Sequence, residues 1–245
     1  MRRYQFVDCT YVLGQPDAGR EQYLRSHIPG ASFLGLDDEL SDPSIRDQGR
    51  HPLPDAERFA EAVGRAGIGA GVFVVAYDRG GGGAARLWWL LRHFGRDDCA
   101  VLRGGIDAWQ GPLRAGEEEV EPGVFVPRTR TGDTIDADEL HARLGELGLV
   151  IVDARAPERY RGEVEPIDPV AGRIPGAVNW PYAGASPESV PPEVADAQEV
   201  VVYCGSGVSA CADLLALSLA GRPEAKLYPG SWSDWCARAL PAERG

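Results

Sequence analysis

The sequence contains the same set of short motifs twice, and this repeat restricts the fold more than any other feature. Each set holds a hydrophobic segment with an aspartate, an Ile-Pro-Gly-Ala motif, a longer hydrophobic run and a glycine-containing segment rich in tryptophan. Because the four motifs recur in the same order, we expect two copies of one domain. The paired segments are residues 6–9 and 151–154, 28–31 and 174–177, 72–78 and 200–204, and 104–109 and 229–235.

The positions of the motifs predict where the two domains begin and end. We expect a first domain at residues 1–118, a linker at residues 119–132 and a second domain at residues 133–245. The linker prediction rests on three glutamates at 117–119, followed by prolines and a glycine, which favour an irregular connection.

Hydrophobic runs alternate with helical patterns inside each copy. Residues 149–152, 200–203 and 226–228 are short apolar runs, which are typical of buried parallel strands. Between the last two, a helix is expected at residues 209–219, ended by Gly221. The alternation predicts an α/β fold with two tandem domains, each a mostly parallel sheet flanked by helices.

Composition excludes several classes of function. The net charge of -12 and the pI near 4.8 disfavour binding to nucleic acid or to acidic membranes. No run of about 18 apolar residues suggests a membrane span, and the first residues lack the apolar core of an export signal. The five cysteines form no CxxC pair, which fits free thiols in a reducing cytoplasm and gives no sign of a metal site. We therefore expect a cytoplasmic protein.

Cys204 is the candidate nucleophile. It follows the predicted strand at 200–203 and precedes a glycine-containing loop that leads into the next helix. In open α/β sheets, ligands bind beyond the carboxyl ends of the strands, close to a helix N-terminus. Backbone N–H groups in such a loop favour an anion, so they would stabilise a thiolate or a persulfide. The loop residues are Gly205, Ser206, Gly207, Val208 and Ser209.

Two comparisons sharpen the interpretation of this loop. The first copy has Asp78 at the position that matches Cys204, and an aspartate cannot carry a sulfane sulfur, so we expect the first copy to be catalytically silent. A phosphatase with a Cys-x5-Arg loop would need an arginine at position 210 to bind phosphate, and this position is Ala210. A cysteine that is merely buried in the core remains the plain structural alternative.

Taken together, the motifs resemble those of tandem-domain sulfurtransferases of the rhodanese family, with an inactive first copy and an active second one. The resemblance rests on the doubled Ile-Pro-Gly-Ala motif, on Leu-Trp-Trp-Leu at 87–90, and on the segment 228–235. The uncharged loop at 204–210 is similar to that of 3-mercaptopyruvate sulfurtransferases, whereas thiosulfate sulfurtransferases of the family carry basic residues there.

The resemblance also implies roles for further residues. Arg159 matches the arginine with which the family binds its substrate, and a guanidinium suits a carboxylate. A second arginine that is usual in mercaptopyruvate enzymes has no counterpart at residues 165–169. Asp37 and His51 align loosely with an aspartate and a histidine that assist the loop serine, although a structural role at the domain boundary is the simpler expectation for both.

The resemblance implies a covalent persulfide on Cys204 and no metal or organic cofactor. We expect a small-molecule sulfur donor, with 3-mercaptopyruvate favoured, and a thiol, thioredoxin or cyanide as acceptor. Two other interpretations stay open: a thiosulfate:cyanide sulfurtransferase with the same chemistry, and a persulfide carrier that passes sulfur to a partner protein. Steady-state turnover with a small donor separates an enzyme from a carrier.

Overall fold

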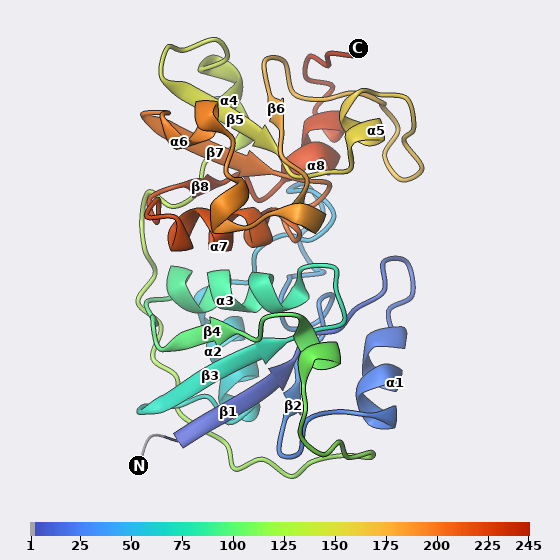
Figure 1. The fold of residues 1–245 in the computed structure, drawn as a ribbon, viewed down its shortest axis with the longest axis vertical. Helices are drawn as coiled ribbons and strands as arrows, with labels where there is room; N and C mark the ends of the chain where they lie inside the picture. The colour runs from blue at the N-terminus through green and yellow to red at the C-terminus, as the bar shows by residue number, and fades with distance from the viewer. Residues whose placement is uncertain (1–2) are drawn as a thin grey trace. The chain divides into compact units, whose positions relative to one another are not determined.

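A computed structural model describes residues 3–245 of the chain (Figure 1). The chain forms two compact units. The first comprises the described residues up to Pro43 together with Leu53–Arg130, and the second comprises Ser44–Pro52 together with Thr131–Gly245. The short segment 44–52 therefore belongs to the second unit, although it lies within the first copy of the sequence repeat.

The first unit is built on a four-stranded parallel sheet with the strand order β2-β1-β3-β4. Helix α3 packs against β3 and β4, and Figure 1 shows it lying along one face of the sheet. The strands are β1 (Arg3–Asp8), β2 (Ser32–Phe33), β3 (Val72–Tyr77) and β4 (Cys99–Val101), and the helices are α1 (Ala18–Arg25), α2 (Ala56–Arg65), α3 (Gly83–His93) and the 3-10 turn Gly105–Ala108.

The second unit repeats this arrangement with the strand order β6-β5-β7-β8, again parallel throughout. Helix α7 packs against β7 and β8, as α3 does against β3 and β4. The strands are β5 (Leu149–Asp153), β6 (Val178–Asn179), β7 (Glu199–Tyr203) and β8 (Lys226–Leu227), and the helices are α4 (Ala137–Ala142), α5 (Pro157–Tyr160), α6 (Pro192–Ala195), α7 (Ala210–Leu219) and α8 (Ser231–Ala237), with 3-10 turns at Tyr182–Gly184 and Pro187–Ser189. The prediction of two tandem α/β domains with parallel sheets is confirmed.

The repeated Ile-Pro-Gly-Ala motif forms the same turn in both units. In the second unit, the N–H of Ala177 donates to the carbonyl of Ile174, and Gly176 has a φ of 75°. A β-turn with proline second and a positive-φ residue third is of type II, which explains the Pro-Gly pair. The N–H of Ile174 donates to the hydroxyl of Tyr203 at 3.1 Å, so the turn is fastened to the last residue of β7.

The first unit has the corresponding contact. The N–H of Ile28 donates to the hydroxyl of Tyr77, the last residue of β3, at 3.2 Å. Both tyrosines are fully buried. The repeat therefore preserves a tertiary contact. In each unit the turn contacts the last residue of a central strand, β3 or β7, and the loop with Asp78 or Cys204 begins directly after it.

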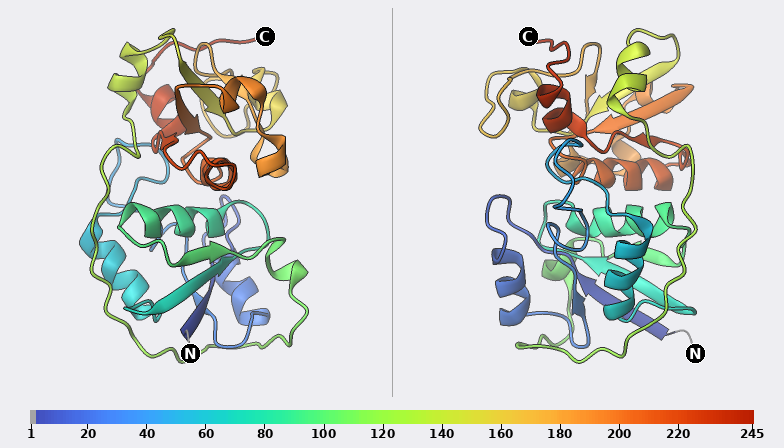
Figure 2. Two further views of the ribbon diagram at one scale, coloured as in Figure 1. Left: turned by 60° about the vertical axis from the view of Figure 1, so that its left-hand side comes forward. Right: turned by 180° about the vertical axis from the view of Figure 1, so that it is seen from behind.

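The segment expected to link the domains is fastened to the first unit. The chain from residue 109 to Arg130 is extended and runs along the outside of that unit (Figure 2). The N–H of Gly123 donates to Gly64, that of Arg128 to Phe94, and that of Arg130 to His93. Much of the predicted linker is therefore ordered by backbone hydrogen bonds.

No helix in the described part of the chain is long and apolar enough to cross a membrane.

Candidate functional site

Cys204 lies directly after β7, at the carboxyl end of a central strand of the second sheet. Its side chain is buried with 1% of its surface exposed. The loop that follows is buried through Val208, and α7 begins at Ala210. The structure thus places the predicted nucleophile where parallel α/β sheets present their ligands.

Residues at the start of α8 hold the Cys204 loop in place. The N–H of Trp232 donates to the carbonyl of Cys204, and the N–H of Ser233 donates to that of Gly205, both at 3.0 Å. In return, the N–H of Cys204 donates to the hydroxyl of Ser231 at 3.1 Å. Ser231 has a φ of 54°, a strained value for a residue other than glycine, which is typical of functional sites.

The loop presents backbone donors that the described protein leaves unused. The N–H groups of Gly205, Ser206 and Val208 donate to no partner among residues 3–245. Because buried N–H groups are nearly always paired in native proteins, such a group of free donors indicates a place for an anion. A thiolate or persulfide on Cys204 is an anion within the same loop.

The matching loop of the first unit already holds an anion of its own. The Asp78 carboxylate accepts hydrogen bonds from the N–H groups of Gly80 and Ala84, both at 2.9 Å. Its backbone carbonyl accepts from Ile106, as that of Cys204 accepts from Trp232. The two loops are thus built alike, with a carboxylate in one and a thiol in the other.

His51 lies against the loop serine. Its Nδ1 atom is 2.7 Å from the hydroxyl oxygen of Ser206, and both side chains are buried. This contact is internal to the second unit because the segment 44–52 belongs to it. Asp37, which the resemblance loosely pairs with His51, lies in the first unit, where it is exposed.

Arg159 lies in a group of acidic residues next to the loop. Its Nε and Nη2 atoms donate to Glu165, and Nη2 also donates to Asp168 at 3.2 Å. Its Nη1 atom makes no hydrogen bond to a described residue, and it lies 3.5 Å from where a Cβ on Gly205 would be. The carboxylates therefore orient the guanidinium toward the residue that follows Cys204.

Arg50 is a site residue that sequence reasoning missed. Its Nη1 atom donates to Asp168 at 2.6 Å, and its Nη2 atom lies 3.4 Å from the carbonyl oxygen of Gly205. The only sequence signal was its position directly before His51. The family resemblance points to a second arginine close to Arg159 in sequence, at residues 165–169, and gives no signal at residue 50.

A buried carboxyl in α7 belongs to the surroundings of the loop. Asp213 is fully buried, and neither of its oxygens has a partner among the described residues. Burial, and next the negative charge of a Cys204 thiolate, raise the pKa of Asp213 well above its ordinary value. Burial therefore disfavours a negative charge on this carboxyl, which lies near the nucleophile.

The other four cysteines offer no competing nucleophile. Cys9 and Cys211 are fully buried, and the pKa of Cys9 is raised well above its usual value by burial. Burial likewise raises the pKa of Cys99 to about 12 and that of Cys236 to about 11. The raised pKa values disfavour the thiolates of Cys9, Cys99 and Cys236, so these thiols are poor nucleophiles.

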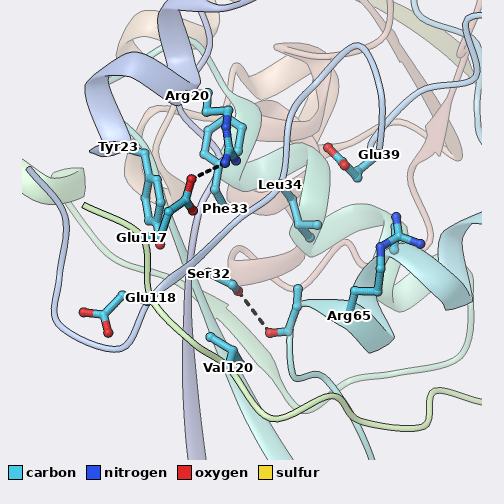
Figure 3. A pocket seen from close by; sticks show the side chains of 12 residues that line it. Arg20, Tyr23, Ser32, Phe33, Leu34, Glu39, Arg65, Glu117, Glu118 and Val120 are labelled. Atoms are coloured by element: carbon cyan, nitrogen blue, oxygen red, sulfur yellow. Dashed lines mark hydrogen bonds and ion pairs between the residues drawn. The ribbon is translucent and has the colours of Figure 1, made fainter. Parts of the chain in front are cut away.

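A cavity of about 240 Å³ in the first unit carries no comparable chemistry (Figure 3). Arg20 and Arg65 reach its wall, and so do three glutamates, of which Glu117 pairs with Arg20. Ser32, also in the wall, uses its hydroxyl on the carbonyl of Ala66. With no cysteine or histidine in its lining, this cavity has no group suited to sulfur transfer.

Comparison with known proteins gives consistent matches over the whole chain. The model of the rhodanese-like domain matches twice, at residues 2–112 and 136–238. A probable 3-mercaptopyruvate sulfurtransferase of Pseudomonas aeruginosa is 45% identical, over 94% of this chain and 88% of the relative. A putative thiosulfate sulfurtransferase of Mycobacterium tuberculosis is 40% identical, over 98% and 90%.

A solved structure agrees with these matches. The 3-mercaptopyruvate sulfurtransferase from Leishmania major superposes with a TM-score of 0.83 at 30% identity, covering 96% of this chain and 71% of that one. The likeness therefore extends from the sequence to the fold of both units.

Proposed function

This chain belongs to the rhodanese-like family of sulfurtransferases, and on that premise we propose that it transfers sulfur from 3-mercaptopyruvate through a persulfide on Cys204. Both copies match the family, and the relatives named for this activity cover most of the chain. The observation that carries the proposal is the position of Cys204 in a buried loop whose free N–H groups favour an anion.

The proposed reaction has two steps. The Cys204 thiolate attacks the donor sulfur, an S–S bond forms, the C–S bond of mercaptopyruvate breaks, and its electron pair leaves on the enolate of pyruvate. The enolate takes up a proton and departs as pyruvate. An acceptor then attacks the outer sulfur, the S–S bond breaks, and the Cys204 thiolate returns.

The loop has groups suited to each charge in this reaction. The N–H groups of Gly205, Ser206 and Val208 can donate to the persulfide anion. In this scheme the Ser206 hydroxyl, 2.7 Å from His51 Nδ1, donates to an enolate oxygen, and the histidine supplies it with a proton. Arg159 binds the carboxylate of the donor in this scheme.

The donor is assigned from the charge of the loop. Residues 204–210 contain no basic side chain of their own, and the cations near Gly205 belong to Arg50 and Arg159, which lie outside this loop. A compact dianion such as thiosulfate calls for cations within the loop that carries the sulfur. A thiosulfate donor remains the second candidate because one relative at 40% identity is named a putative thiosulfate sulfurtransferase. We infer a thiol, thioredoxin or cyanide as acceptor, and the cytoplasm as the site of action.

Steady-state kinetics with two donors and one thiol acceptor tests this assignment. We expect kcat/KM for 3-mercaptopyruvate to exceed that for thiosulfate by about tenfold or more, equal to about 1.4 kcal/mol. A tenfold preference for thiosulfate would reverse the donor assignment. Single turnover without steady-state turnover on either donor would identify a persulfide carrier instead of an enzyme.

A further inference from the structure

The charged side chains next to the Cys204 loop form one alternating series of guanidiniums and carboxylates. Asp168 accepts from Arg50 at 2.6 Å and from Arg159 at 3.2 Å. Glu165 in turn accepts from Arg159 at 2.7 Å. In order, the series runs through Arg50, Asp168, Arg159, Glu165, Arg155 and Asp153. Each positive charge in the series is therefore matched by a negative one.

The carboxylates of this series are buried, and the guanidiniums at its outer end are partly accessible. The side chains of Asp168 and Glu165 are each 3% exposed, whereas that of Arg159 is 16% exposed and that of Arg50 is 28% exposed. Glu165 also accepts from the N–H of Asp168 at 3.1 Å, which fixes the position of the second carboxylate.

The accessible end of the series lies beside the residue that follows the nucleophile. A Cβ on Gly205 would be 3.2 Å from Arg50 Nη2 and 3.5 Å from Arg159 Nη1. Asp168 contacts both of these guanidiniums. An anion that enters beside Gly205 therefore meets cations whose charge is already balanced by a buried carboxylate in contact with them.

Net charge separates donors that hydrogen bonding alone would accept alike. Guanidinium N–H groups bind both carboxylates and oxoanions at short range. The Coulomb energy scales with the charge of the donor, so Asp168 repels a dianion about twice as strongly as a monoanion at the same place. Because Asp168 is buried, salt screens this repulsion less than that of a surface charge. The repulsion is therefore greater for thiosulfate than for 3-mercaptopyruvate, whose carboxylate carries one charge.

We propose that Asp168 is a specificity residue that disfavours dianionic sulfur donors by cancelling positive charge beside Gly205. The inference rests on the proposed function and deepens it, because it names the side chain that sets the charge class of the donor. It also explains how a site with two arginines near the nucleophile can favour a monoanion over thiosulfate.

Kinetics of Asp168→Asn with both donors test this proposal. The asparagine keeps the size of the side chain and one oxygen acceptor but removes the charge. The ratio of kcat/KM for thiosulfate to kcat/KM for 3-mercaptopyruvate should rise about tenfold. A disturbed guanidinium affects both donors and largely cancels in this ratio. Glu163→Gln is the matched control, since Glu163 is exposed and pairs with Arg161, and it should leave the ratio unchanged.

Two unreactive anions with the same tetrahedral head measure the charge effect without turnover. Sulfate is a dianion and methanesulfonate a monoanion, and protection of Cys204 from the neutral reagent iodoacetamide gives their dissociation constants. In Asp168→Asn, binding of sulfate should tighten about tenfold more than binding of methanesulfonate. A purely structural role of Asp168 would change both constants alike.

A second variant covers the case in which Asp168→Asn does not fold. Glu165→Gln removes the next negative charge of the series and should shift both ratios in the same direction. Ratios within twofold of wild type in the variants that fold would overturn the role of Asp168 while leaving the proposed donor intact. A tenfold preference of the wild-type protein for thiosulfate would instead contradict the proposed function itself.

Discussion

At the residue scale, the candidate site separates groups by the charge they carry. Cys204 lies in a loop in which the N–H groups of Gly205, Ser206 and Val208 have no partner among the described residues. Arg159 donates to the carboxylate of Glu165, and burial raises the pKa of Asp213. The reacting sulfur therefore has dipoles beside it, and the full positive charges are placed where a donor carboxylate would bind. This division suits a donor whose anionic group and transferable sulfur are separate atoms.

Ser206→Ala tests whether the loop hydroxyl takes part in the reaction. If Ser206 donates to the enolate, kcat for 3-mercaptopyruvate should fall by about a hundredfold, with a small change in KM. Ser209→Ala gives an internal comparison, because that side chain makes no capping hydrogen bond at the start of α7, and it should lose much less. Similar losses in the two variants would assign Ser206 a packing role only.

Arg159→Lys tests whether the planar guanidinium of Arg159 binds 3-mercaptopyruvate. The lysine keeps the charge but cannot contact Glu165 and Asp168 while also pointing an N–H at Gly205. We expect kcat/KM for 3-mercaptopyruvate to fall by the worth of one charged hydrogen bond, roughly 1.5–3 kcal/mol. Most of the loss should be in KM. Wild-type kinetics with both donors would remove Arg159 from the site.

Cys204 and its loop could be predicted from sequence because strand, glycines and helix are contiguous there. Arg159 could be predicted because it lies in a short motif after β5. Arg50 could not, since its contact with Gly205 spans 155 residues. Such a contact depends on which unit the segment 44–52 packs with, and no local pattern of residues predicts that packing.

At the element scale, the two sheets end in loops of the same construction with different occupants. The Asp78 carboxylate accepts from two N–H groups of its own loop, whereas the N–H groups of Gly205, Ser206 and Val208 have no partner among the described residues. The first loop is therefore stabilised by its own side chain. In the proposed reaction, the free N–H groups of the second loop would donate to the persulfide anion.

Asp78→Ala should separate stability from activity. The variant loses two hydrogen bonds from backbone N–H groups to a carboxylate, comparable to loss of a helix cap, so the free energy of unfolding should fall by about 0.5–2 kcal/mol. Sulfur transfer, measured well below the unfolding transition, should stay near the wild-type rate. A loss of activity as large as that of Cys204→Ser would show that the first copy takes part in the chemistry.

Glu199 joins three elements of the second unit and gives a pH-dependent prediction. It accepts from Arg143, which follows α4, and pairs with Lys226 of β8, and these hydrogen bonds lower its pKa from 4.5 to about 2. Because the folded pKa lies below the unfolded value, this carboxylate stabilises the fold above pH 4.5, and the contribution is lost as pH falls toward 2.

Glu199→Gln should therefore lower the free energy of unfolding at pH 7 by about 1–2 kcal/mol, discounted because the pair is partly exposed. The difference from wild type, measured by urea unfolding, should shrink as pH falls below 4.5. Glu146→Gln is the control, since Glu146 also pairs with Arg143 but is exposed, and its effect should be smaller. A difference that is independent of pH would rule out the ion pairs as its source.

At the scale of the whole molecule, the internal repeat made the fold predictable. The matching motifs predicted two parallel sheets, and the Ile-Pro-Gly-Ala motif makes the same contact in both units, from the Ile174 N–H to Tyr203 and from the Ile28 N–H to Tyr77. The path of the chain between the two copies could not be predicted from the sequence. Residues 119–130 form backbone hydrogen bonds to the first unit, and their acidic, proline-containing composition reports only irregular structure.

The central claim is that one sulfur atom is transferred as a persulfide on a single residue, Cys204. The most direct measurement is mass spectrometry of the intact protein after reaction with 3-mercaptopyruvate and removal of excess donor, followed by peptide mapping without reductant. The account predicts a gain of one sulfur atom per chain, located on the peptide with Cys204, and no gain in Cys204→Ser. A sulfur atom on Cys9, Cys99, Cys211 or Cys236, or continued loading of the serine variant, would contradict it.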